Sequence, residues 1–489
     1  MTDRPAIAVA LHDGFYGSGT GAGYANRGFL QTLIGLIPPR IRLVVMPVYL
    51  ASDSPQYQAD WHRESLGICQ AAKAAVRPLD NGTGGQTRFG DVPAFQCLAS
   101  STAEVLAGEL PPHSQSAVIF LDIPFLGAAP LLPEQILPRL AVVPRSTGLL
   151  HDPGNQARIQ FESDGLRCIA NRGGRIAAIS GYMRNHLTED YHVPANALLD
   201  LPDGLTAGEW SGHRPSPPDL PSRAKNGFLL SYGRAEPYKG WDDLVEALAK
   251  LRDRRGDVPH ALLAAVTDQP SPTAYQRHLA SRIKSLDLDA TLVTRFDPAI
   301  RALLVHPALR AVVIPSRAEP FGRVPLEAYA AGAAPVVATT AGGLAEQVID
   351  GVTGLAASPA DPASLAGAID RALQLTAAEL DRMRGAGQHL ARTRFDCRIA
   401  VGRFLDQFAP SITTPLAGRR QRLSSRRNAK HGTVQENQIH QPERKRDFAP
   451  LVCAPSSRGA RAQARVIGRT HPRWSRRPRR TWRIGRTPT

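Results

Sequence analysis

Short apolar runs alternate with longer amphipathic stretches along the first two hundred residues of this 489-residue chain. Short apolar runs suit buried strands, whereas apolar residues recurring every three or four positions suit helices. Strands that alternate with helices build a mostly parallel sheet, so the pattern predicts an α/β domain over residues 1–210. The predicted strands are Ala6–Leu11, Leu43–Tyr49, Ala117–Leu121, Gly148–Leu150 and Ile176–Ile179, and the predicted helices include Tyr24–Leu36 and Tyr182–Tyr191.

A Pro-rich polar stretch over residues 211–226 interrupts the alternation and predicts a linker. The alternation then restarts, which predicts a second α/β domain over residues 227–398. Its last predicted helix begins after Asp361, a residue type that caps helices, with Pro362 at the first helical position. The predicted strands are Phe228–Tyr232, Ala261–Val266, Thr291–Val293, Ala311–Ile314 and Pro335–Ala338, and the predicted helices are Asp242–Leu251, Pro272–Leu286 and Pro362–Leu375.

The charge of the chain is concentrated near its end. The net charge is +16, but residues 418–489 hold 20 Lys or Arg and three acidic residues, which leaves the preceding part at −1. The globular part therefore lacks the basic surface that nucleic-acid binding requires. Residues 410–489 show no apolar periodicity, and we expect a disordered Arg-rich tail. One interpretation of this tail is a basic arm for nucleic acid or an anionic membrane, with Trp474 and Trp482 among the arginines. The other is a frameshift, since GC-rich sequence translated out of frame gives a similar mixture of residues. We favour the frameshift.

Cysteine usage and hydropathy indicate a cytoplasmic protein. The five cysteines are widely spaced and form no Cys-x-x-Cys pair, so we expect free thiols in a reducing compartment. No apolar run approaches the roughly 18 residues that a membrane span needs. No cluster of His, Cys, Asp and Glu has the spacing of a metal site, and we expect neither a metal nor a cofactor.

The most informative segment is the string Glu319 to Glu327, which lies between a predicted strand and a helix. Pro325 suits a first helical turn, so the backbone N–H groups of Phe321 to Val324 are free to face a ligand. The two carboxylates can accept hydrogen bonds from sugar or ribose hydroxyls. In the competing interpretation the two carboxylates bind no ligand: Glu319 is a solvent-exposed acid, and Glu327 is an acid near a helix start, where the helix dipole favours negative charge.

Two further motifs lie on either side of this string in the second domain. They are Gly233-Arg234 with Lys239-Gly240, and Gly342-Gly343-Leu344-Ala345-Glu346 followed by Gly351 to Leu355. With these motifs and the string Glu319 to Glu327, the second domain resembles that of retaining glycosyltransferases with the GT-B fold, in which two Rossmann-like domains face each other across a cleft, and specifically the family-4-like group. The resemblance covers about residues 228–375.

The resemblance implies roles for individual residues. Arg234 and Lys239 would neutralise the diphosphate of a nucleotide-sugar donor, Glu327 would hold the ribose, and Glu319 would hold the transferred sugar. The residues implied to contact the donor through backbone or side chain are Gly233, Phe321, Gly322 and Arg323. Residues 399–409 resemble the helix with which this fold crosses back onto the first domain.

Four features of the first domain give weaker signals. The loop Gly17 to Gly23, with Gly19 and Gly21, can approach a phosphate or sugar closely, although a loop without chemical role is nearly as plausible on sequence alone. His151 resembles the active-site histidine of the family, against the alternative of a loop histidine. Asp122 is a candidate for the acceptor site, but a cap is the more common role of such a residue. Asp203-Gly204 stands where relatives often carry Asn-Gly.

We therefore expect a retaining, metal-independent glycosyltransferase that moves a sugar from a nucleoside-diphosphate sugar to an unidentified acceptor. The acceptor can be an envelope glycan, a glycolipid or a secondary metabolite such as an aminocyclitol, and the sequence does not decide among them. Peripheral contact with a membrane is also left open. The alternatives are a nucleotide-sugar epimerase, a phosphorylase, or a nucleic-acid-binding protein acting through the basic tail. Binding to nucleic acid is the least favoured of these because the globular part is neutral.

Overall fold

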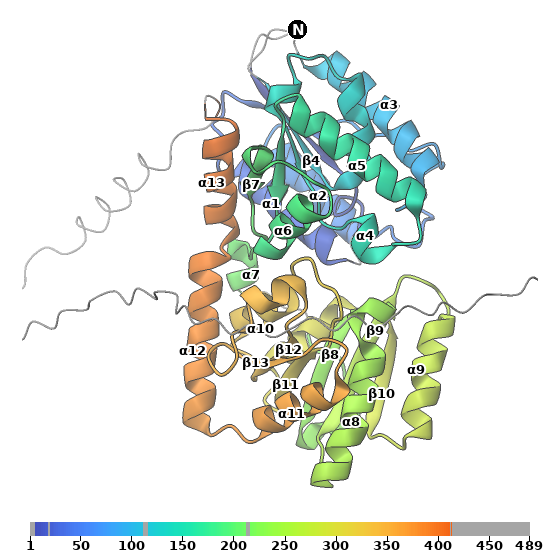
Figure 1. Cartoon of the computed structure of the whole chain (residues 1–489), viewed down its shortest axis with the longest axis vertical. Helices are drawn as coiled ribbons and strands as arrows, with labels where there is room; N and C mark the ends of the chain where they lie inside the picture. The colour runs from blue at the N-terminus through green and yellow to red at the C-terminus, as the bar shows by residue number, and fades with distance from the viewer. Residues whose placement is uncertain (1–4, 18–19, 111–115, 212–215, 411, 413–489) are drawn as a thin grey trace, which may run out of the picture. The chain divides into compact units, whose positions relative to one another are not determined.

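A computed structural model describes residues 5–17, 20–110, 116–211, 216–410 and 412. Two parallel sheets organise these residues (Figure 1). We call the first sheet with its helices the first lobe and the second sheet with its helices the second lobe. The predicted α/β architecture is confirmed. The expected tail over residues 410–489 lies outside the described residues except for positions 410 and 412, and Gly19 and part of the 211–226 linker also lie outside them.

The first sheet has seven strands in the order β3-β2-β1-β4-β5-β6-β7, and all its neighbours pair in parallel. The interior strand β1 is buried along its whole length, which explains its unbroken apolar run. The strands are β1 (Ala6–Leu11), β2 (Arg42–Pro47), β3 (Ala75–Val76), β4 (Ala117–Leu121), β5 (Leu140–Val143), β6 (Arg175–Ala178) and β7 (Leu198–Asp200).

Helices cover both faces of this sheet. Their starts follow local capping chemistry: Asp91 accepts a hydrogen bond from Ala94 N at the start of α3, and Asn155 accepts one from Arg158 N at the start of α5. The helices are α1 (Gly21–Ile34), α2 (Ala59–Ala71), α3 (Val92–Glu109), α4 (Gly148–His151), α5 (Gln156–Asn171) and α6 (Gly181–Glu189), with 3₁₀ turns η1 (Ile123–Leu131), η2 (Leu137–Arg139) and η3 (Ala195–Ala197). The short helix α7 (Ala207–Ser211) lies in the segment that leads to the second lobe.

The second sheet has six parallel strands in the order β10-β9-β8-β11-β12-β13. The strands are β8 (Phe228–Arg234), β9 (His260–Thr267), β10 (Ala290–Arg295), β11 (Leu309–Ile314), β12 (Val336–Thr339) and β13 (Leu355–Ala357). Its helices are α8 (Trp241–Arg255), α9 (Ala274–Ser285), α10 (Val324–Ala331), α11 (Pro362–Leu373) and α12 (Ala377–Arg394), with 3₁₀ turns η4 (Ser222–Asn226), η5 (Pro237–Lys239), η6 (Pro298–Val305) and η7 (Gly342–Glu346).

One predicted strand is wrong. Gly148–Leu150 is not a strand but the first part of helix α4, and the strand of this region is β5, which precedes it. An apolar run of only three residues fits either state. The four residues of β5 are all buried between β4 and β6, so tertiary burial and not the local pattern selects the strand.

The chain crosses between the lobes twice. Leu205 N donates to Phe395 O (2.9 Å) and Cys397 N donates to Leu205 O (3.1 Å), so the outward and returning segments pair as a short bridge. The returning segment continues as α13 (Cys397–Phe408), whose Phe404 ring lies 6.3 Å from Phe29 of α1. Figure 1 shows α12 alongside the second lobe and α13 alongside the first.

This packing makes α13 a part of the first lobe's core. Phe404 is fully buried, so we expect Phe404→Ala to destabilise the protein by about 3–5 kcal/mol through lost burial and a residual cavity. Gln407→Ala, on the exposed face of the same helix, is the matched control and should change stability little. Thermal unfolding checks both variants, and equal melting temperatures would contradict the assigned packing.

Among the described helices, none combines the length and the apolar character needed to cross a membrane.

Candidate active site

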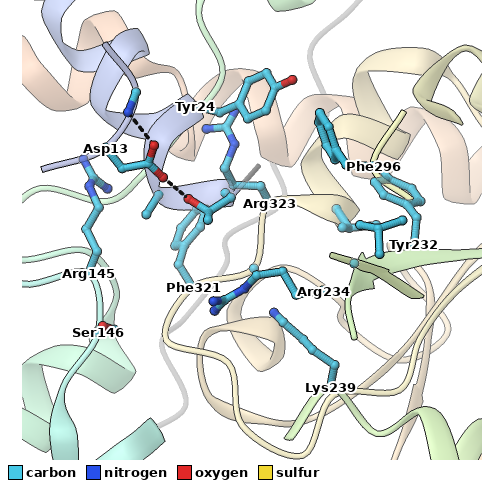
Figure 2. Close-up of a pocket in the computed structure, with 18 of the residues that line it drawn as sticks. Asp13, Tyr24, Arg145, Ser146, Tyr232, Arg234, Lys239, Phe296, Phe321 and Arg323 are labelled. Carbon is cyan, nitrogen blue, oxygen red and sulfur yellow. Dashed lines mark hydrogen bonds between the residues drawn. The ribbon is translucent and has the colours of Figure 1, made fainter. Parts of the chain in front are cut away.

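A cavity of about 410 Å³ lies between the lobes, at the carboxyl ends of strands from both sheets. The first lobe lines it with residues that follow β1, β2, β4 and β5, and the second lobe with residues that follow β8, β9 and β11. Ligands of open α/β sheets collect at this edge because the loops there can vary while the strands hold them in place. Figure 2 shows Asp13 and Arg145 of the first lobe opposite Arg234 and Lys239 of the second.

Arg234 and Lys239 lie together on the second-lobe wall. Arg234 ends β8, and Lys239 ends the 3₁₀ turn η5 five residues later. The Arg234 guanidinium donates to the Tyr238 hydroxyl, and Lys239 Nζ lies 5.6 Å from the centre of the Tyr238 ring. Lys239 Nζ also forms an ion pair with Glu319 Oε2 at 2.5 Å. Three residues singled out from distant parts of the sequence therefore form one charged cluster.

Backbone geometry fixes Glu319 in this cluster. Its carbonyl accepts a hydrogen bond from Gly343 N (2.9 Å), and its carboxylate accepts one from the Ser316 hydroxyl (3.3 Å). Gly322 has a φ of +84°, and a Cβ there would lie 2.5 Å from Leu344 Cδ2 and 2.9 Å from Glu319 Cγ. Only glycine fits this close approach, which explains why it interrupts the string. Gly233 and Phe321 also line the cavity.

Glu327 is held by protein partners. It lies in the first turn of α10, and its Oε2 accepts a hydrogen bond from the Tyr232 hydroxyl at 2.8 Å. Its Oε1 lies 3.0 Å from the Arg301 guanidinium and 3.7 Å from Arg323. Burial raises the pKa of Tyr232, and the neighbouring Glu327 carboxylate adds to the effect. Tyr232 therefore stays a hydrogen-bond donor, and Glu327 keeps a fixed orientation at the cavity wall.

Arg323 lies where the chain crosses between the lobes. Its Nη1 donates to Gly204 O (2.9 Å), and its Nη2 pairs with the Glu209 carboxylate. The side chain lines the cavity, yet its guanidinium is largely occupied by the first crossing segment. The predicted donor contact of Arg323 therefore stays a prediction, and the structure gives this residue a connection between lobes that the sequence did not indicate.

His151 ends α4 and faces the cation cluster. Its ring packs edge-on against Tyr238 at a centroid distance of 4.7 Å. Burial, and then the charges of Arg234 and Lys239, lower the pKa of His151 to about 4, so the ring is neutral near pH 7. Its Nδ1 atom is buried and has no hydrogen-bond partner. A neutral imidazole with an unsatisfied nitrogen can bind a ligand hydroxyl.

The Gly-rich loop leads into the first helix of the chain. Thr20 caps α1 by accepting a hydrogen bond from Gly23 N (3.0 Å), and Gly21 begins the helix and lines the cavity. A Cβ on Gly21 would lie 3.7 Å from Arg323 Cδ, so the two lobes are close at this point. The start of α1 therefore borders the cavity, as the sequence suggested.

Asp122 and Asp203 are both engaged by Arg145. Asp122 has a φ of +96° and accepts hydrogen bonds from Ile123 N (2.8 Å) and Arg145 N (3.1 Å), which is the structural role expected for it. Asp203 Oδ1 pairs with Arg145 Nη1 at 2.5 Å, and Arg145 Nε donates to Asn26 Oδ1 at 2.5 Å. These contacts fix Asp122, Arg145 and Asp203 on the side of the cavity that the first lobe forms.

Asp13 is a site residue that the sequence analysis did not identify. It follows the buried strand β1, lines the cavity, and accepts hydrogen bonds from Gly14 N (2.6 Å) and the Thr20 hydroxyl (2.5 Å), as Figure 2 shows. Burial raises the pKa of its carboxyl group to about 6. Its position at the carboxyl end of a strand was the available signal, since the same reasoning led to Asp122.

In the part of the chain that the structure describes, no group of three or more His, Cys, Asp or Glu side chains is placed to hold a metal ion.

Sequence comparison shows that the second lobe is similar to a known protein family. The model of the family "Glycosyl transferases group 1" matches residues 214–389. Residues 214–389 are therefore similar in sequence to that family. Among curated relatives, the chain is 36% identical over 209 residues to a D-inositol 3-phosphate glycosyltransferase of Frankia alni, covering 41% of this chain and 50% of the relative. It is 34% identical over 223 residues to a glycogen synthase of Mycobacterium tuberculosis, covering 45% and 51%. The chain thus spans about half the length of the curated relatives it matches.

Solved structures match both lobes. A sucrose-phosphate synthase from Thermosynechococcus elongatus superimposes with a TM-score of 0.63 at 19% identity, covering 86% of this chain and all of that one. Anabaena HepE, crystallised with UDP-glucose, gives a TM-score of 0.57 at 18% identity and covers 83% of this chain and 99% of that one. At these identities the likeness shows the fold, and the predicted GT-B fold is confirmed.

Proposed function

We propose that this chain is a retaining glycosyltransferase that moves a sugar from a nucleoside-diphosphate sugar to a hydroxyl of an acceptor bound by the first lobe. The observation that carries the proposal is the cluster of Arg234, Lys239 and Glu319 at the cavity wall. The relatives support the same class, since they include a D-inositol 3-phosphate glycosyltransferase and a glycogen synthase.

The chemistry of the reaction matches this cluster. Breaking the bond between the sugar and the diphosphate leaves negative charge on the departing oxygen atoms. Fixed cations stabilise that charge most strongly in a cavity that excludes water. Arg234 can contact two phosphate oxygens at once through its planar guanidinium, whereas Lys239 acts as a compact point charge. We assign both residues to the diphosphate.

Donor binding has a defined consequence for the Lys239–Glu319 pair. Lys239 Nζ is held at 2.5 Å by Glu319 in the described structure. When a diphosphate arrives, the ammonium can share its three N–H donors between the phosphate and the carboxylate. Glu319 then keeps lone pairs for sugar hydroxyls. The Phe321 and Gly322 backbone completes the sugar subsite, and Glu327, oriented by Tyr232, accepts the ribose hydroxyls.

We propose retention of the anomeric configuration from the resemblance of the second lobe to retaining enzymes. Asp13 on the first-lobe wall is close enough to Arg234 for that charge to act on its pKa. An acceptor on the first lobe would then approach the side of the sugar from which the diphosphate leaves. Attack from that side gives a product with the anomeric configuration of the donor, and proton NMR of the product determines it.

The proposed function is tested with the purified chain and a panel of nucleotide sugars, scored by release of nucleoside diphosphate. An extract of small metabolites supplies acceptors, and a Lys239→Ala variant gives the background. We expect release with at least one donor of the panel. Release that never exceeds the variant's background with any donor would refute the assignment.

We also predict that turnover needs no divalent cation, because Arg234 and Lys239 supply positive charge at the diphosphate. Activity should stay within about twofold when EDTA is added to metal-free reagents, since the cations that act in the transition state are protein side chains. Initial rates with and without EDTA check this. Complete loss in EDTA that magnesium or manganese restores is the contrary result.

A further inference from the structure

Aromatic side chains face the cavity from the first lobe. Tyr49, after β2, is 45% exposed and Phe89, before α3, is 41% exposed, and both line the cavity. Tyr49 packs edge-on against Tyr16 (6.1 Å), and Phe89 packs edge-on against His12 (5.0 Å). Among the large exposed apolar side chains of the described residues, these are the two aromatic ones. Exposed aromatic faces inside a cavity are typical of ligand sites.

The arginine that the first lobe contributes to the cavity, Arg145, is already paired with protein groups. Arg145 is 6% exposed, and its guanidinium is bonded to Asn26 and Asp203. Burial lowers the pKa of His12 to about 4, so this ring is neutral near pH 7. The described first-lobe residues that line the cavity therefore offer no unpaired cation to a phosphate group.

Asp13 is an acidic group on this wall that Arg145 does not engage. Each of its carboxylate oxygens accepts one hydrogen bond, from Gly14 N or from Thr20, whereas a carboxylate has about four lone-pair sites. The charged groups that act on it are Asp268 and Arg234, both across the cavity in the second lobe. Asp13 therefore follows His12, which packs against Phe89, and lies within electrostatic reach of Arg234, which is assigned to the donor.

We infer that Asp13, Tyr49 and Phe89 form the acceptor subsite, and that it takes an unphosphorylated ring bearing hydroxyl or ammonium donors. The apolar face of the ring would rest on the aromatic side chains, and one donor group would bind Asp13. A phosphorylated ring is disfavoured because its charge would meet the Asp13 carboxylate without a compensating cation. This inference rests on the proposed function and extends it to the acceptor.

The product of transfer tests the inference directly. The chain is incubated with a donor labelled in the sugar and with a small-metabolite extract, and the labelled product is passed over ion exchangers at pH 7. Label beyond that of a Lys239→Ala control should flow through both exchangers or bind the cation exchanger, which separates hydroxylated from aminated acceptors. Product retained on the anion exchanger, or release of nucleoside diphosphate without such product, would overturn the inference. Absence of nucleoside diphosphate release would instead count against the proposed function.

Variants test the three residues with the acceptor so found. Asp13→Asn should lower kcat/KM for the acceptor about 10- to 100-fold, the effect of losing a charged hydrogen bond, while the donor KM stays within about twofold. Phe89→Ala and Tyr49→Ala should each lower it about three- to tenfold through lost stacking. Leu131→Ala, an exposed apolar residue outside the cavity, is the control.

The pH profile separates a ligand contact from a purely structural role. The pKa of Asp13 is about 6, so kcat/KM for the acceptor should fall below about pH 6 in the unaltered chain. Asp13→Asn should remove this acidic limb, because the amide does not titrate in this range. An acidic limb near pH 6 that persists in Asp13→Asn, or an acceptor kcat/KM that all three variants leave unchanged, would overturn the assignment.

Discussion

Replacing Lys239 by Ala should lower turnover about a hundredfold and affect donor binding much less, by analogy with the loss of one transition-state donor. The value of the ammonium rises as negative charge develops on the leaving diphosphate. In the ground state part of its charge is already used by Glu319 at 2.5 Å. The effect should therefore fall mainly on kcat. Initial rates over a range of donor concentrations give kcat and KM separately.

A surface lysine is the matched control for this experiment. Lys250 on α8 forms an ion pair with Glu246 (3.6 Å) far from the cavity lining, so Lys250→Ala removes the same charge without touching the site. Thermal unfolding of both variants establishes that each is folded. If kcat of a folded Lys239→Ala protein stayed within about twofold of the unaltered chain, the assignment of this cluster to the diphosphate would be wrong.

Gly240→Ala should be the most damaging single substitution for the architecture of the donor site. Gly240 follows Lys239 and begins α8 with a φ of +72°, and a Cβ there would lie 1.9 Å from the carbonyl oxygen of Pro315. Both groups are backbone, so neither a rotamer change nor a small shift relieves the clash. We expect a loss of about 4 kcal/mol or more, the range of the most severe substitutions.

The same helix provides the control. Gly256 ends α8 with a φ of +73°, close to the φ of Gly240, but no atom lies within 4 Å of a Cβ built on it. Gly256→Ala should therefore cost only the strain of a positive φ, about 1–3 kcal/mol. Denaturant unfolding of the two variants gives the difference. Equal losses would show that backbone conformation, and not the approach of Pro315, requires glycine at position 240.

The gathering of Arg234, Lys239 and Glu319 on the second-lobe wall of the cavity could be predicted because its signal is local in sequence. Arg234 and Lys239 are five residues apart at the end of a buried strand, and Glu319 to Glu327 form one string between a strand and a helix. Strand burial and helix capping place such segments without knowledge of the rest of the chain. The unbroken apolar run of β1 and the Asp361 cap of α11 were predictable for the same reason.

The rest depends on contacts between distant residues. Arg323 contacts Gly204 and Glu209, which lie more than a hundred positions earlier, so its place at the crossing could not be seen in the string that contains it. Asp13 is a single acid with no motif around it. Its importance arises from burial and from the opposite wall, neither of which the sequence displays.

Whether the cavity binds a nucleoside diphosphate is the central question, and calorimetric titration of the purified chain with ADP, GDP, CDP, UDP and TDP answers it most directly. We predict saturable one-to-one binding of at least one of these. Binding should weaken about tenfold or more in Arg234→Ala, through loss of a charged hydrogen-bonding group, and weaken to a lesser extent in Lys239→Ala. Lys250→Ala should leave it unchanged. Failure of all five ligands to bind, or equal affinities in Arg234→Ala and Lys250→Ala, would contradict the account.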